Sequence, residues 1–175
     1  MRGASAAIVL VLTLATAACG SSPTAKNGTA ATPPDSTIST AAVSGRAQML
    51  AAVRVAILAD HRLAVRTLWT NSVPDHTVAT AGPQLADLRR SVAARRQRGV
   101  RVKLLSERFR IVSVDLDPSY TSATAIVADP QQVRPYSSDG RPLGAKVSLN
   151  ERARLQLRRL GTSPRFVVWE VTAIR

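Results

Sequence analysis

Guanidinium groups dominate the side chains of this sequence that could bind a ligand. Nine basic residues lie within 22 positions: Arg89, Arg90, Arg95, Arg96, Arg98, Arg101, Lys103, Arg108 and Arg110. Helical spacing would bring Arg89 and Arg96 to one flank, with Arg95 and Arg98 close by. Guanidinium groups bind phosphates and carboxylates with two parallel hydrogen bonds. The cluster therefore predicts an anion-binding surface, although the solvated helix face of any arginine-rich protein would have the same composition.

A second basic group lies in the last third of the chain, where Arg152, Arg154 and Arg158 fall on one face of an alternating segment. These residues widen the predicted cationic surface, or they protect an exposed strand edge from aggregation. The anion-binding candidates drawn from the two groups are Arg89, Arg95, Arg96, Arg98, Arg152, Arg154 and Arg158.

Glu151 is the one candidate for acid–base catalysis. It alternates in step with Leu149, Ala153 and Leu155, which places it on the apolar face of a predicted strand. A buried carboxylate has a raised pKa that suits proton transfer. In the competing interpretation, Glu151 lies near the open end of the strand and pairs with an arginine, while His61 and His76 are exposed. This second interpretation is preferred, because a single carboxylate without an identifiable partner does not make a catalytic site.

The sequence predicts no metal site and no cofactor. Its two histidines are far apart and its carboxylates are scattered, so no recognisable ligand set stands out. Cys19 is the only cysteine, which excludes an intrachain disulfide and a cysteine-rich zinc site. Neither a phosphate-binding glycine loop nor a Gly-x-Ser-x-Gly motif is present.

The first 44 residues are predicted to be an export signal and a tether. Arg2 precedes an apolar run over residues 6–15, and Thr16, Ala17, Ala18 and Cys19 follow. This pattern resembles the lipobox of bacterial lipoproteins, from which Thr16 departs because leucine is common at that position. The resemblance implies cleavage after residue 18, acylation of Cys19 and anchoring to the membrane. The alternative is an ordinary secretory signal cleaved after Ala17. Residues 19–44, rich in Ser, Thr, Pro and Ala, read as a flexible tether.

The net charge of +13, from 24 Lys and Arg against 11 Asp and Glu, favours polyanionic partners. Export makes nucleic acid an unexpected partner. It leaves an envelope protein, an anionic lipid or an anionic wall polymer at the outer face of the cell membrane.

Residues 45–175 are predicted to form one basic domain. Apolar residues at three- and four-residue spacing predict a helix after Ser44, with a bend at Asp60 and His61, and a second helix over residues 84–97 that ends at Gly99. Alternating and β-branched segments predict strands over residues 109–116, 120–128, 149–158 and 166–171. Because helices precede antiparallel strands, the predicted class is α+β.

This order of elements resembles the nuclear transport factor 2-like superfamily over roughly residues 46–174. The residues that carry the likeness are the junction from Leu58-Ala59-Asp60 to Leu68-Trp69, Leu85-Ala86-Asp87-Leu88 leading to Gly99, and the strand pairs 111–116 with 123–127 and 153–157 with 167–171. The resemblance implies a curved sheet wrapped as a cone around the helices, with a pocket inside. Some members are isomerases, cyclases or dehydratases, and many are non-enzymatic.

Three functions remain open from the sequence. The preferred one is a non-catalytic binding or assembly module for an envelope protein, a small apolar ligand or an anionic polymer. The others are an isomerase-like or cyclase-like enzyme that uses Glu151 in the cone pocket, and an accessory subunit of an envelope secretion or transport system.

Overall fold

The computed structural model describes residues 40–174. Two helices, α1 (Thr40–Thr70) and α2 (Gly82–Gln97), precede five strands: β1 (Val100–Glu107), β2 (Arg110–Leu116), β3 (Ser122–Ser137), β4 (Val147–Arg159) and β5 (Phe166–Ala173). The helices pack on an antiparallel sheet that does not close on itself, so the predicted α+β class is confirmed. The predicted signal peptide, Cys19 and most of the predicted tether lie outside the described residues.

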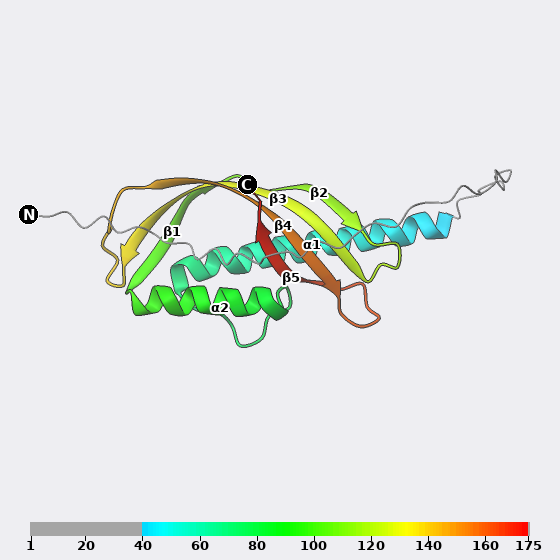
Figure 1. Cartoon of the computed structure of the whole chain (residues 1–175), viewed down its shortest axis with the longest axis horizontal. Helices are drawn as coiled ribbons and strands as arrows, with labels where there is room; N and C mark the ends of the chain where they lie inside the picture. The colour runs from blue at the N-terminus through cyan, green and yellow to red at the C-terminus, as the bar shows by residue number, and fades with distance from the viewer. Residues whose placement is uncertain (1–39, 175) are drawn as a thin grey trace, which may run out of the picture. The chain divides into compact units, whose positions relative to one another are not determined.

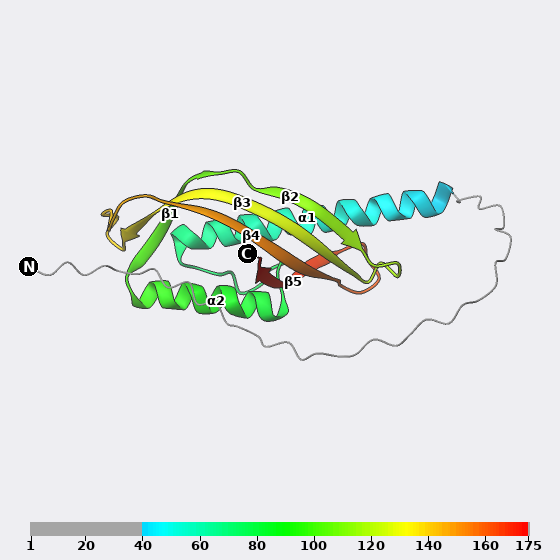
Figure 2. The same cartoon turned by 45° about the horizontal axis from the view of Figure 1, so that its top comes forward.

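The long strand β3 organises the sheet. In the order β1-β3-β4-β5, all neighbours are antiparallel, and β2 also pairs with β3. The first half of β3 pairs with β2 (Ala123 opposite Leu116), and its second half pairs with β1 (Ser137 opposite Val100). Figures 1 and 2 show the strands curving over α1 and α2, which lie on the same side of the sheet. Neither helix is apolar enough over a sufficient length to cross a membrane.

The core lies between α1 and the central strands. Val53 and Ile57 of α1 are fully buried, and they belong to one cluster with Leu155 and Leu157 of β4 and Val168 of β5. The neighbouring positions of β4, Arg154 and Gln156, are exposed. The alternation predicted for this strand, apolar inside and polar outside, is therefore present in the fold.

The bend predicted at Asp60 and His61 is wrong, because α1 runs through both residues without a break. Asp60 is only 6% exposed, and its carboxylate accepts a 2.5 Å hydrogen bond from the Thr80 hydroxyl. Burial raises the pKa of this carboxyl to about 6. Asp60 thus makes a tertiary contact with Thr80 and does not end the helix. Helix α1 also begins at Thr40, so the predicted boundary between tether and domain falls inside it.

Strand β3 continues through Asp129 and Pro130, where the sequence predicted its end. Pro130 is tolerated because of its place in the sheet. Its carbonyl accepts a 3.0 Å hydrogen bond from the N–H of Arg108, which lies between β1 and β2. In an antiparallel strand the nitrogen and the carbonyl of one residue point to the same side, so the Pro130 nitrogen also points to this junction. The ladder is interrupted at this junction, so the missing N–H of proline removes no regular pairing.

The outer edge of β5 is covered by the segment before α2. The Ala81 N–H donates to the Val168 carbonyl (3.0 Å), and the Val168 N–H donates to the Ala79 carbonyl (2.8 Å). Gly82 then turns the chain into α2 with a φ of +56°. The start of α2 is therefore fixed directly against the sheet edge.

Candidate functional site

Two of the predicted anion-binding arginines, Arg89 and Arg96, line the same hollow on the surface of α2. They are seven residues apart, two helical turns, and both are exposed. The hollow has a volume of about 410 Å³, and its remaining wall consists of Val73, Val92, Ala93 and Gln97. An apolar floor between two fixed positive charges suits an anionic group that is attached to a less polar body.

Arg95 does not belong to this surface, which corrects its place among the anion-binding candidates. It is 8% exposed, and its guanidinium donates to the Asn71 side-chain oxygen (3.0 Å), the Ser91 hydroxyl (2.8 Å) and the Thr67 carbonyl (2.9 Å). Burial, together with the charge of Arg98, lowers the pKa of this group. Arg95 instead joins α2 to the C-terminal end of α1.

The other arginine candidates occupy different surfaces. Arg98 is exposed at the end of α2, where its Nε donates to the Ala94 carbonyl (3.1 Å). Arg152 and Arg154 are exposed on the face of β4 that points away from the core and the helices. The Arg158 guanidinium lies 4.2 Å from the centroid of the Trp169 ring. Within residues 45–174, no ion pair involves any of the six exposed candidates Arg89, Arg96, Arg98, Arg152, Arg154 and Arg158.

Glu151 lies opposite Asp129 of the neighbouring strand. By register it is on the face that carries Leu155, as predicted, but it is exposed because it lies beyond the buried rows. Partial burial and the charge of Asp129 raise the pKa of its carboxyl. Its polar contact is with the Gln131 amide (3.5 Å) rather than with an arginine. Glu151 lines neither the hollow on α2 nor the second hollow, beside α1 and Phe166.

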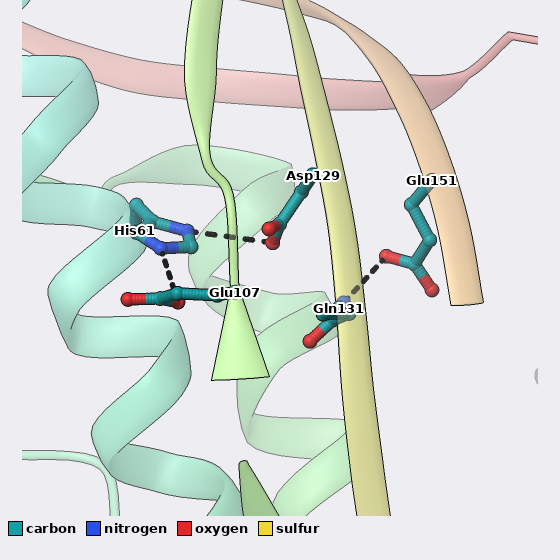
Figure 3. A network of polar contacts seen from close by, with 5 residues as sticks. All are labelled: His61, Glu107, Asp129, Gln131 and Glu151. Atoms are coloured by element: carbon teal, nitrogen blue, oxygen red, sulfur yellow. Dashed lines mark hydrogen bonds and ion pairs between the residues drawn. The ribbon is translucent and has the colours of Figure 1, made fainter. Parts of the chain in front are cut away.

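A cluster that the sequence did not predict forms around His61 (Figure 3). Its Nε2 lies 3.0 Å from a Glu107 carboxylate oxygen, and its Nδ1 lies 3.9 Å from an Asp129 carboxylate oxygen. The Phe109 ring stacks on the imidazole at a centroid distance of 3.9 Å. The His61 side chain is 15% exposed, so the expectation that both histidines are exposed is wrong for this one. His76 is exposed in the loop before α2.

Burial raises the pKa of the Asp129 carboxyl; the charge of His61 lowers it, and that of Glu107 raises it further. One ligand-type atom from each of His61, Glu107 and Asp129 lies within 4.8 Å of the others. One histidine and two carboxylates that were predicted to be scattered are therefore brought together here.

Sequence reasoning missed this cluster because its members come from α1, β1 and β3, far apart along the chain. They converge where β1 and β2 meet along β3. One local signal was present: Asp129 follows an apolar alternating run, and carrying that strand through Pro130 would have placed a carboxylate on the core side of the sheet.

No protein-family model matches the chain, and no curated protein matches it. Among solved structures, the chain is similar to the crystal structure of the intermembrane space region of the chloroplast protein ARC6, with a TM-score of 0.51 and 13% sequence identity. The match covers 68% of this chain and 91% of the ARC6 chain. At this identity, the likeness concerns the fold alone.

Proposed function

We propose that the chain is an exported bacterial lipoprotein, anchored through Cys19, whose domain is a non-catalytic binding module at the outer face of the cell membrane. The apolar run and small residues before Cys19 support the export and the anchor. Two helices on one side of a curved antiparallel sheet support the likeness to the nuclear transport factor 2-like cone. The excess of 24 basic over 11 acidic residues supports an anionic partner.

The hollow on α2 is the observation that carries this proposal. Its polar wall consists of Arg89, Arg96 and Gln97. Guanidinium groups stay protonated at any physiological pH, and an amide does not titrate, so none of these groups can exchange a proton with a substrate. They can donate several hydrogen bonds to phosphate or carboxylate oxygens. The hollow is therefore equipped for binding the phosphate or carboxylate groups of an anionic lipid or wall polymer.

Replacing both Arg89 and Arg96 with glutamine is expected to weaken binding of fluorescently labelled polyphosphate to the mature full chain held in neutral detergent. A basic residue near an anionic surface contributes about 1 kcal/mol, so the double variant should lose roughly 30-fold in affinity. Binding by the unmodified chain should also weaken as the salt concentration rises, because exposed charges are screened. Fluorescence anisotropy measures both effects.

The matched control replaces Arg152 and Arg154 with glutamine, which removes the same charge from the outer face of β4. We expect this variant to lose less than about threefold in affinity, since these residues line no hollow with Arg89. Equal losses in the two double variants would show that only the overall charge attracts the polymer, and the assignment to the hollow would be wrong.

A further inference from the structure

The cluster formed by His61, Glu107 and Asp129 lacks the basic partners that the chain has in excess. Within residues 45–174, His61 is the only basic side chain that lies within ion-pair distance of Glu107 or Asp129. Glu151 also lies on this side of the sheet and adds to the negative charge around Asp129. His61 is therefore the one source of positive charge beside these two carboxylates among the described residues, and the lack of arginine and lysine leaves room for a second source, a bound cation.

The orientation of the imidazole indicates what that source is. The 3.0 Å contact lets Nε2–H donate to Glu107, and this tautomer leaves the lone pair of Nδ1 facing the Asp129 carboxylate. Stacking on Phe109 holds the plane of the ring. The 3.9 Å between Nδ1 and the Asp129 oxygen is too long for a hydrogen bond. Bonds of about 2.0–2.2 Å from a zinc-like ion to nitrogen and to oxygen would bridge this gap once the two atoms approach each other by a few tenths of an ångström.

A second observation concerns the other oxygen of Asp129. This atom, Oδ1, is buried and has no hydrogen-bond partner among the described residues. A buried carboxylate oxygen without a partner is costly and rare in folded proteins. The negative charge of the carboxylate is shared by both of its oxygens, so a cation bound beside Asp129 would also neutralise the charge on Oδ1.

We propose that His61 and Asp129 bind one divalent transition-metal ion, with Nδ1 and the carboxylate as ligands. Glu107 holds the imidazole through Nε2, the arrangement in which an outer carboxylate orients a metal-bound histidine. A mixed nitrogen and oxygen set favours ions of the zinc class over calcium and magnesium, which prefer oxygen alone. The site lies apart from the hollow on α2 and is independent of the proposed function.

Zinc titration of the mature, tag-free full chain, first stripped with a chelator, tests this proposal. A competing fluorescent zinc indicator should report one ion bound per chain. We expect H61Q and D129N each to weaken binding at least 100-fold, and E107Q to weaken it about 10- to 100-fold, as is typical of an orienting carboxylate. The matched control is H76Q, which alters the other histidine and should bind like the unmodified chain.

Thermal unfolding with and without zinc provides a second readout, because a ligand that binds the folded state raises Tm. Zinc should raise the Tm of the unmodified chain and of H76Q, but not that of H61Q or D129N. If H61Q fails to fold, E107Q decides the question, since Glu107 is 39% exposed and its replacement should leave the fold intact. The proposal is overturned if the unmodified chain shows no saturable zinc binding, if H61Q or E107Q binds as tightly as it does, or if H76Q loses binding.

Discussion

Replacing Gly82 with alanine is expected to lower the free energy of unfolding by about 2–4 kcal/mol. Gly82 has a φ of +56°, a conformation that costs a residue with a Cβ roughly 1–2 kcal/mol. The added Cβ would also lie 2.7 Å from two carbon atoms of the Trp169 ring. The Arg158 guanidinium lies 4.2 Å from the centroid of the same ring, so a shift of the ring away from Gly82 would disturb this contact. Overpacking of this kind typically costs about 1–3 kcal/mol.

Urea unfolding followed by circular dichroism measures this loss, and Gly161→Ala is the matched control. Gly161 has a φ of +63°, but a Cβ there would meet no atom within 4 Å. The control therefore carries the backbone strain without the steric clash, and it should cost about 1 kcal/mol. Equal losses at the two positions would mean that the added Cβ meets no resistance from Trp169, and the predicted steric clash would be wrong.

Arg95→Met is expected to destabilise the protein by about 3 kcal/mol, although residues 89–110 contain seven other arginines. The substitution keeps an apolar stem in the buried position but removes three hydrogen bonds. It leaves the buried Asn71 side-chain oxygen without its donor, while the carbonyl of the buried Thr67 keeps only its hydrogen bond from the Asn71 N–H (3.1 Å). A buried polar group without a partner costs about 1–3 kcal/mol.

The neighbouring Arg96→Met is the control for Arg95→Met, because Arg96 is exposed on the same helix. Its effect on the midpoint of urea unfolding should stay within about 0.5 kcal/mol. A loss for Arg95→Met as small as the loss for Arg96→Met would contradict a structural role for the buried guanidinium.

The class of the fold and much of its detail could be predicted from local pattern. Helix α2 was evident from the spacing of Leu85, Leu88 and Val92 and from Gly99, whose φ of +62° and N–H bond to the Arg96 carbonyl end the helix. The alternation of β4 also identified its buried and exposed faces. These elements are determined by the spacing of their apolar residues and by the residues that end them, and both can be recognised within one short segment of sequence.

Strand β1 (Val100–Glu107) was not among the predicted strands. The other errors lie where a polar residue makes a contact with a distant part of the chain. Asp60 and His61 read as a helix bend, and Asp129 with Pro130 read as the end of a strand, because the same residue types mark breaks in most chains. In this fold, the Asp60 carboxylate accepts a hydrogen bond from the Thr80 hydroxyl, and the His61 ring contacts carboxylates of two strands, β1 and β3. The same limit applies to Arg95, which no local feature distinguishes from its exposed neighbours. Burial of such groups depends on long-range packing, which a local pattern does not contain.

The proposed function requires the domain to stand outside the cytoplasm on a lipid anchor, where its positive charge meets envelope anions. Intact mass spectrometry of the chain extracted from membranes of its bacterial host tests this requirement most directly. We expect a mature chain that begins at Cys19 and carries the added mass of its acyl chains, and a Cys19→Ser variant that is no longer retained in the membrane. A chain that begins at Met1 in the soluble cytosolic fraction, or one that begins at Ala18 without acyl chains, would contradict the lipid anchor.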